Sequence, residues 1–139
     1  MARTVEEIMT HDPRTVDAGA SIREAAQAMR ESDIGDVIVM ADGQATGIVT
    51  DRDIVIRAIA EGRDPDSTTV GDVATTDLQA LSPEQSVDEA VEIMRAKDIR
   101  RLPVCKHGRP VGVLSLGDLA VERDPQSALA DISAASPDR

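Results

Sequence analysis

The sequence contains no phenylalanine, tyrosine or tryptophan, and this absence limits both its core and its ligands. A core without aromatic rings has to be packed from isoleucine, valine, leucine, alanine and methionine. A bound base would lie between aliphatic side chains and backbone, because no ring is present to stack on it. The composition therefore excludes an aromatic stacking platform for single-stranded nucleic acid.

Cysteine and long apolar runs are also scarce. Cys105 is the only cysteine, so the chain cannot form an internal disulfide, and a reducing compartment is expected. No apolar run approaches the length that crosses a membrane, and residues 1–20 lack the apolar segment of a signal peptide. These absences predict a cytoplasmic protein.

Positive charge is in short supply. The chain has 15 basic and 26 acidic residues, which gives a formal net charge of −11. Such a balance disfavours nucleic acid and anionic membranes as partners. A small anion would need local arginines, and the candidates are Arg52, Arg100, Arg101 and Arg109.

The second half of the sequence repeats the first at an offset of 65 residues. Helix starts, helix ends, hairpins and strands recur in one register without a gap: Val5 on Val70, Ser21 on Ser86, Glu24 on Glu89, Met29 on Met94, Asp33 on Asp98, Gly43 on Gly108 and Gly47 on Gly112. This indicates an internal duplication, with repeats over residues 1–64 and 65–124. Each repeat is too small to bury both faces of a short sheet, so we expect the two to pack together about a pseudo-twofold axis.

Both repeats predict the same order of elements. Ser21 and Glu24 form a capping box at a helix start, and Asp42-Gly43 is typical of a tight hairpin. The expected elements of the first repeat are a strand at residues 15–16, a helix from Ser21 to near Asp33, strands over residues 37–40 and 45–49, and a helix from residue 51. The predicted fold class is α/β (α+β) with a β-α-β-β-α order in each repeat. Residues 125–139, rich in Ala, Ser, Asp and Pro, are predicted to be disordered.

A hydroxyl residue followed three positions later by aspartate marks the strand-to-helix junction of each repeat. These pairs are Thr50 with Asp53 and Ser115 with Asp118. One interpretation is a capping box that only stabilises the helix start. The other is an anion site, because free N–H groups and the helix dipole favour a phosphate there. The recurrence of the pair favours the functional interpretation.

With these features the sequence resembles the CBS domain family, in the form of a tandem pair called a Bateman module. The resemblance rests on the doubled order of elements, on the segments Gly47 to Asp53 and Gly112 to Asp118, and on the segment Ile99 to Val104 at the entry into a strand. It covers roughly residues 3–122, nearly the whole chain.

The resemblance implies two three-stranded sheets that pack face to face, with clefts between the repeats that hold AMP, ADP, ATP or S-adenosylmethionine. In the family the aspartate accepts hydrogen bonds from ribose hydroxyls, and the Thr or Ser contacts a phosphate. The resulting candidate ligand contacts are Thr50, Arg52, Asp53, Ser115, Asp118, Arg100, Arg101, Val16, Gly35, Asp36, Leu81 and Pro103.

The register also predicts that the two clefts do not bind the same ligand equally. Arg100 and Arg101 correspond to Gly35 and Asp36, while Arg52 corresponds to Gly117. The first difference places a carboxylate in one repeat where the other has two guanidinium groups. The second difference places a guanidinium in the first repeat where the second repeat has none.

Metal binding and catalysis have little support. Cys105 and His107 are two apart and would share a strand face, with His11 as a third ligand, but Cys105 is better interpreted as a small core residue. Neither histidine lies in a nucleophile–base pattern. We therefore expect no metal, no required cofactor and no enzyme.

Two hypotheses about function remain. The first is a regulatory module that binds an adenine nucleotide and signals to a protein target in trans or through self-association. The second is a structural module that dimerises without a small ligand. The resemblance implies a homodimer in either case, and it points to the small stand-alone CBS-pair proteins, some of which are linked to stress or hypoxic responses.

Overall fold

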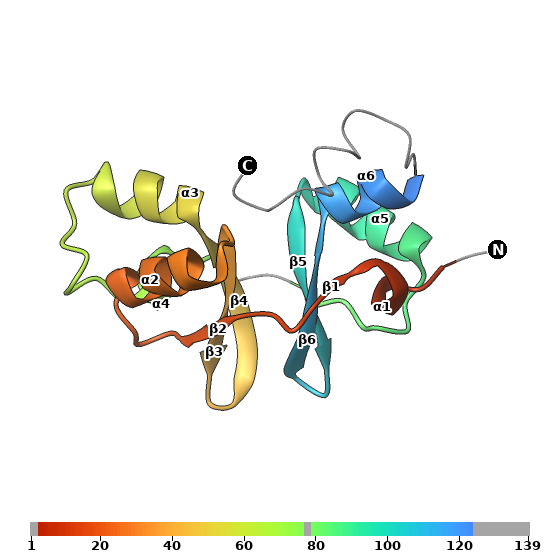
Figure 1. Cartoon of the computed structure of the whole chain (residues 1–139), viewed down its shortest axis with the longest axis horizontal. Helices are drawn as coiled ribbons and strands as arrows, with labels where there is room; N and C mark the ends of the chain where they lie inside the picture. The colour runs from red at the N-terminus through yellow and green to blue at the C-terminus, as the bar shows by residue number, and fades with distance from the viewer. Residues whose placement is uncertain (1–2, 77–78, 124–139) are drawn as a thin grey trace. The chain divides into compact units, whose positions relative to one another are not determined.

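The computed structural model describes residues 3–76 and 79–123, which form two compact units (Figure 1). One unit covers residues 14–76, and we call it the Thr50 unit. The other combines residues 3–13 with residues 79–123, and we call it the Ser115 unit. The N-terminal segment of the first repeat thus belongs to the unit built mainly from the second repeat. The predicted disordered residues, 125–139, lie outside the described residues.

The Thr50 unit surrounds a three-stranded sheet in the order β2-β3-β4. Its elements are β2 (Thr15–Asp17), α2 (Ile22–Ser32), β3 (Asp36–Ala41), β4 (Gln44–Thr50), α3 (Asp51–Ile54), the π-helix η1 (Val55–Ile59) and α4 (Val70–Val73). Ser21 caps α2 by accepting the Glu24 N–H, and Asp33 ends it in the left-handed region. The hairpin between β3 and β4 turns at Asp42 and Gly43, both with positive φ, as a twisted two-residue turn requires.

The Ser115 unit contains the sheet β1-β6-β5. Its elements are α1 (Val5–Ile8), β1 (Thr10–His11), α5 (Val87–Lys97), β5 (Arg101–Lys106), β6 (Arg109–Ser115) and α6 (Leu116–Arg123). Ser86 and Asp98 cap the two ends of α5, just as their counterparts cap α2. The mixed fold with two three-stranded sheets confirms the predicted class, while the pseudo-twofold packing of the repeats stays a prediction.

A short bridge flanks the central hairpin of each sheet on either side. On one side the partner is parallel: Val16 beside Val39 in the Thr50 unit, and Leu81 beside Val104 in the Ser115 unit. On the other side the partner is antiparallel: Thr75 beside Ile48, and Thr10 beside Val113. Both bridges obey the 65-residue register, so the duplication extends to the pairing of the strands.

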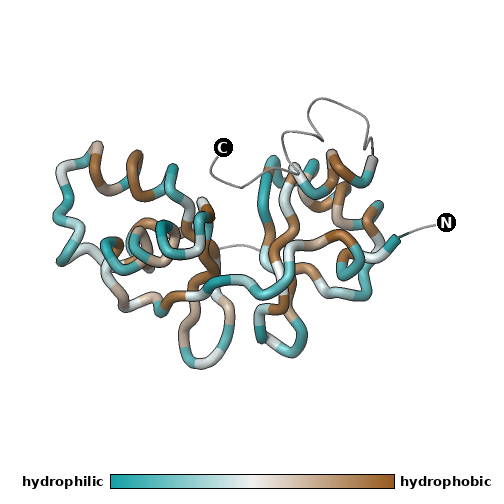
Figure 2. Tube along the Cα trace, viewed as in Figure 1, coloured by the Kyte–Doolittle hydropathy of each residue, from teal (hydrophilic) through white to brown (hydrophobic). Residues whose placement is uncertain are grey.

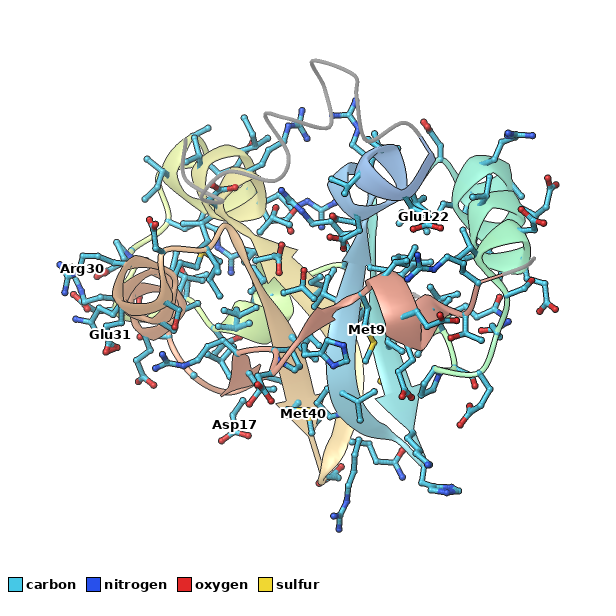
Figure 3. All side chains as sticks on the ribbon, turned by 45° about the vertical axis from the view of Figure 1, so that its right-hand side comes forward. Met9, Asp17, Arg30, Glu31, Met40 and Glu122 are labelled. Carbon is cyan, nitrogen blue, oxygen red and sulfur yellow. The ribbon has the colours of Figure 1, made fainter. Side chains whose placement is uncertain are left out.

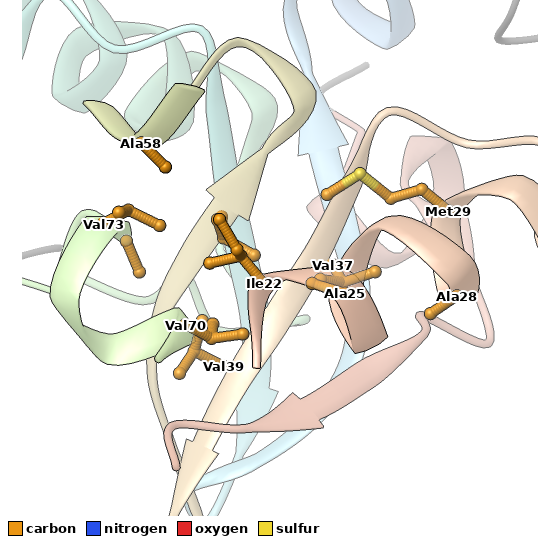
Figure 4. Packing of buried hydrophobic residues seen from close by; sticks show 11 residues of the cluster. Ile22, Ala25, Ala28, Met29, Val37, Val39, Ala58, Val70 and Val73 are labelled. Atoms are coloured by element: carbon orange, nitrogen blue, oxygen red, sulfur yellow. The ribbon is translucent and has the colours of Figure 1, made fainter. Parts of the chain in front are cut away.

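The core of the Thr50 unit lies between the helices and one face of its sheet (Figure 4). Its buried members are Ile22, Ala25, Ala28, Met29, Val37, Val39, Val49, Ala58, Val70, Val73 and Ala74. Figure 2 shows hydrophobic residues along the strands of both units and hydrophilic residues at the hairpin turns. The cluster is aliphatic throughout, as the lack of aromatic residues requires.

In the Ser115 unit, the N-terminal segment supplies part of the core. Val5 is fully buried, and its N–H donates to the Gln85 carbonyl at 2.8 Å. Met9 lies beside β6 (Figure 3), and a Cβ on Gly112 would lie 2.5 Å from its sulfur and 2.8 Å from the backbone carbonyl oxygen of Thr10. Glycine is therefore needed at position 112 for this close approach.

None of the helices in the described part of the chain combines the length and the hydropathy needed to cross a membrane.

Candidate ligand sites

Thr50 is the last residue of β4 and the N-cap of α3. The Asp53 N–H donates to Thr50 Oγ1 at 3.0 Å, and the Thr50 N–H donates to Asp53 Oδ2 at 2.9 Å. This is a complete capping box. It uses one carboxylate oxygen and leaves Oδ1 for another partner.

Ser115 and Asp118 repeat this geometry at the start of α6. The Asp118 N–H donates to Ser115 Oγ at 3.1 Å, and the Ser115 N–H donates to Asp118 Oδ2 at 2.9 Å. The capping interpretation of the sequence is therefore confirmed for both junctions. It does not compete with ligand binding, because an ionised carboxylate has a second oxygen with free acceptor capacity.

The outer oxygens of the two aspartates meet different neighbours. Arg57 Nε lies 3.8 Å from Asp53 Oδ1, and Arg57 also donates to the Val73 carbonyl at 3.2 Å. Thr10 Oγ1 donates to Asp118 Oδ1 at 3.5 Å. Sequence reasoning missed both neighbours, although Arg57 stands four residues after Asp53 on the same helical run and the register pairs Thr10 with Thr75.

Asp118 lies in a partly buried position. Burial raises the pKa of its carboxyl, and the hydrogen bonds from Ser115 and Thr10 lower it to a lesser extent. The side chain of Asp53, which has the Arg57 guanidinium as a neighbour, is 14% exposed. The two acceptors thus share their backbone geometry and differ in their electrostatic environment.

The strand register places further predicted residues on the same sheet face as each junction. Asp36 lies directly opposite Thr50, and Arg101 lies directly opposite Ser115. Cross-strand neighbours of this kind have Cβ atoms about 4.5–5.5 Å apart. Asp36 is therefore the cross-strand neighbour of Thr50 where Arg101 is that of Ser115.

Gly35 and Arg100 act through their carbonyl groups. The Asp51 N–H donates to the Gly35 carbonyl at 3.0 Å, and the Leu116 N–H donates to the Arg100 carbonyl at 2.9 Å. A Cβ on Gly35 would lie 3.1 Å from Asp51 Oδ2, so the glycine lets the Asp51 side chain fold back. Asp51 Oδ1 in turn accepts the Arg52 N–H at 2.8 Å.

The other predicted contacts are spread more widely. Val16 packs against the core cluster of the Thr50 unit, and Leu81 is 1% exposed beside Val104. Pro103 shares the sheet face of Arg101, two residues along β5. Arg109 begins β6 at the hairpin, six residues from Ser115 and so about 20 Å away along the strand, too far to hold the same anion.

The histidines and the cysteine do not come together. Within residues 3–76 and 79–123, no three His, Cys, Asp or Glu side chains gather as a metal site would require. His107 sits in the hairpin turn with a φ of 55°. Cys105 lies on β5, and burial raises the pKa of its thiol, which disfavours the reactive thiolate.

Each unit also has an open hollow between two helices. In the Thr50 unit it is lined by Ala26, Met29, Arg30, Ile34, Asp51, Ile54 and Val55. In the Ser115 unit it is lined by Asp88, Val91, Glu92, Arg95, Leu116, Leu119 and Ala120. Large aliphatic side chains stand exposed along these helices, namely Val55 at 54%, Ile56 at 49%, Ile59 at 51% and Leu116 at 54%.

A family model for the CBS domain matches the chain twice, over residues 5–59 and 70–123. The chain belongs to the CBS domain family. The two matches confirm the tandem pair that the internal repeat predicted, and each match contains one of the hydroxyl–aspartate junctions.

The relatives of this CBS pair include small proteins of similar length. The CBS domain-containing protein YhcV of Bacillus subtilis (strain 168) is 38% identical over 134 residues, covering 94% of this chain and 95% of YhcV. Hypoxic response protein 1 of Mycobacterium tuberculosis is 35% identical over 118 residues, covering 84% of this chain and 82% of the relative.

Solved structures share the fold. The crystal structure of Hypoxic Response Protein I, with two coordinated zinc ions, matches with a TM-score of 0.75 at 34% identity and covers 86% of this chain and 98% of its own. The CBS domain pair of protein MJ0100, in complex with 5′-methylthioadenosine and S-adenosyl-L-methionine, matches with a TM-score of 0.80 over 91% and 100% of the two chains. At 23% identity, this second likeness shows the fold alone.

Proposed function

We propose that this CBS pair is a regulatory, non-catalytic module that binds adenosine-containing ligands at its Thr50 and Ser115 junctions and signals occupancy to a protein target or through self-association. One observation carries the proposal. In both units the capping box uses only Oδ2 of the aspartate, so Oδ1 of Asp53 and of Asp118 can accept hydrogen bonds from a ribose diol.

The likeness to the MJ0100 pair supports the class of ligand, since a protein of the same fold holds two adenosine compounds. Because the chain has no aromatic residue, a bound base would have to lie between aliphatic side chains and backbone. The adenosine compounds to test are AMP, ADP, ATP and S-adenosylmethionine, and none of them is proposed as a required cofactor.

A thermal-shift panel tests the proposal directly. A ligand present at a hundred times its dissociation constant adds about 2.7 kcal/mol to the folded state, which raises the melting temperature measurably. We expect a rise with at least one adenosine compound, and its loss in the Asp53→Asn, Asp118→Asn double variant. The apo stability should change by less than about 1 kcal/mol, well under the contribution of the ligand, because the amide oxygen of asparagine can still accept the cap N–H.

Asp42→Asn is the matched control, because it makes the same chemical change in a hairpin turn that tolerates asparagine. It should leave the ligand-induced rise intact. If no compound of the panel shifts the melting temperature at millimolar concentration, the second candidate function, a dimerisation module without a ligand, is favoured instead. A shift that survives in the double variant would show that the ligand binds elsewhere.

The second candidate is a dimerisation module that works without a ligand. The exposed side chains Val55, Ile56 and Ile59 favour it, because three aliphatic residues on one short helical stretch leave apolar surface for another copy. Light scattering at micromolar concentration should give the mass of a dimer, and the Ile56→Glu, Ile59→Glu variant should give that of a monomer. A monomeric wild type would contradict this candidate.

A further inference from the structure

We propose that the two sites bind different classes of ligand: the Ser115 site takes an adenine nucleotide through its phosphate, and the Thr50 site takes an adenosine compound without phosphate. This inference rests on the proposed function and adds the ligand class of each site. Three differences between equivalent positions of the two sites determine which site favours a phosphorylated ligand.

The first difference lies on the sheet, where Asp36 faces Thr50 and Arg101 faces Ser115. A phosphate at either hydroxyl would therefore have a carboxylate or a guanidinium as its cross-strand neighbour. Both residues already take part in another interaction, so their effect on a ligand comes through their charge. That charge repels phosphate at Thr50 and attracts it at Ser115.

The second difference lies at the first helical residue. Asp51 adds a carboxylate beside Thr50 and occupies the Arg52 N–H with its Oδ1. Its counterpart Leu116 carries no acceptor, so it cannot occupy the N–H of Gly117 in this way. An anion near Ser115 thus meets an amide that its neighbouring side chain does not cap, next to a residue without a Cβ.

The third difference is the total charge. The Thr50 site has three carboxylates and two guanidinium groups, from Asp36, Asp51, Asp53, Arg52 and Arg57. The equivalent positions of the Ser115 site have two carboxylates and two guanidinium groups, from Asp118, Glu122, Arg100 and Arg101. Arg3 lies 3.3 Å from Glu122. The formal charges at the equivalent positions are −1 and 0, and Arg3 adds a positive charge beside Glu122, so a phosphorylated ligand favours the Ser115 site.

Calorimetric titration with adenosine and with AMP tests this division. In Asp53→Asn, where only the Ser115 site keeps its ribose acceptor, we expect AMP to bind at least about tenfold more tightly than adenosine. In Asp118→Asn, where only the Thr50 site keeps it, adenosine should bind at least as tightly as AMP. Adding Arg101→Gln to Asp53→Asn should remove the preference for AMP.

Lys106→Gln is the matched control for Arg101→Gln. It removes one positive charge from the other end of the same strand, β5, and should leave the ratio of AMP to adenosine affinity unchanged. If a single-site variant proves unstable, amide chemical shifts of residues 50–53 and 115–118 report each site separately in the wild-type protein.

Three results would contradict the inference. The first is an equal ratio of AMP to adenosine affinity at the two sites. The charges would then not discriminate between the two ligands, although the proposed function would still hold. If wild-type protein binds neither adenosine nor AMP, the inference fails, and the thermal-shift panel with ADP, ATP and S-adenosylmethionine decides whether the proposed function stands. A preference for AMP that persists after Arg101→Gln would assign the selectivity to other residues.

Discussion

Two aspartates with identical backbone roles occupy different chemical environments because of single neighbouring residues. Asp53 has a guanidinium 3.8 Å from its outer oxygen, whereas the outer oxygen of Asp118 accepts a hydrogen bond from the hydroxyl of Thr10. The sheet face adds a carboxylate at one site and a guanidinium at the other. A duplicated motif therefore does not mean duplicated chemistry.

The environment of Asp118 predicts a pH dependence. Burial raises the pKa of this carboxyl in the folded state, so the protonated form favours folding at low pH, and that stability is lost as the pH rises through the folded pKa. Asparagine stays neutral at every pH, so Asp118→Asn does not suffer this loss. We expect the variant to gain stability relative to the wild type between pH 4 and pH 7, by less than about 1 kcal/mol because the group is only partly buried.

Urea midpoints measured at both pH values, with Asp42→Asn as the control, check this expectation. A difference between wild type and Asp118→Asn that stays constant across the range would contradict it. In the wild type, ligand affinity at the Ser115 site should weaken as the pH falls through the raised pKa, because a protonated carboxyl loses acceptor capacity for the ribose.

The residues of the sites were predictable from the sequence in so far as their contacts are local. Thr50 and Asp53 are three residues apart, and a helix start brings such residues together whatever the rest of the fold does. Thr10 reaches Asp118 across 108 residues, and only the pairing of β1 with β6 makes that contact. The register nevertheless contained a signal, because Thr10 and Thr75 are the same residue type at equivalent positions.

At the scale of elements, the segment after α4 that contains Thr75 approaches β4 closely, and this approach depends on a glycine. A Cβ on Gly47 would lie 2.3 Å from the Thr75 carbonyl oxygen, a distance that the backbone cannot accept. The Ile48–Thr75 bridge, with hydrogen bonds of 3.0 Å in both directions, forms at this point. Gly47 thus leaves the room that the segment after α4 needs to pair with β4, the strand that ends in Thr50.

Gly47→Ala should therefore destabilise the protein by about 1–3 kcal/mol, as expected when a backbone contact is overpacked. Gly19→Ala is the control, because its Cβ would meet nothing within 4 Å. Chemical denaturation of both variants measures the difference. Equal midpoints would show that the linker can move away from β4 at little cost.

The order of elements was predictable because each helix and hairpin carries its own start and stop residues. The division of the chain into compact units was not. It depends on where residues 3–13 and 64–76 pair, and periodicity does not encode the partner of a short strand. The π-helix at Val55–Ile59 was also beyond prediction, since its apolar spacing resembles that of an ordinary helix.

At the scale of the whole molecule, the Ser115 unit depends on residues from the other end of the chain. Deleting residues 1–9 removes α1 and the buried side chains of Val5 and Met9. We expect the amides of β5 and β6 to lose protection in hydrogen exchange, while those of β3 and β4 keep most of theirs. If protection is lost mainly in β3 and β4, the N-terminal segment belongs with its own repeat, contrary to the structure.

Because residues 3–13 pack with residues 79–123, the two units can form only in a certain order during synthesis on the ribosome. The Thr50 unit has all its described parts once residue 76 has emerged, so it can fold early. β1 must wait for β6, which is synthesised about 100 residues later. At roughly 5–20 residues per second this leaves the N-terminal segment without its sheet for about 5–20 s. During that interval Val5 and Met9 lack the sheet beside which they are buried in the folded chain.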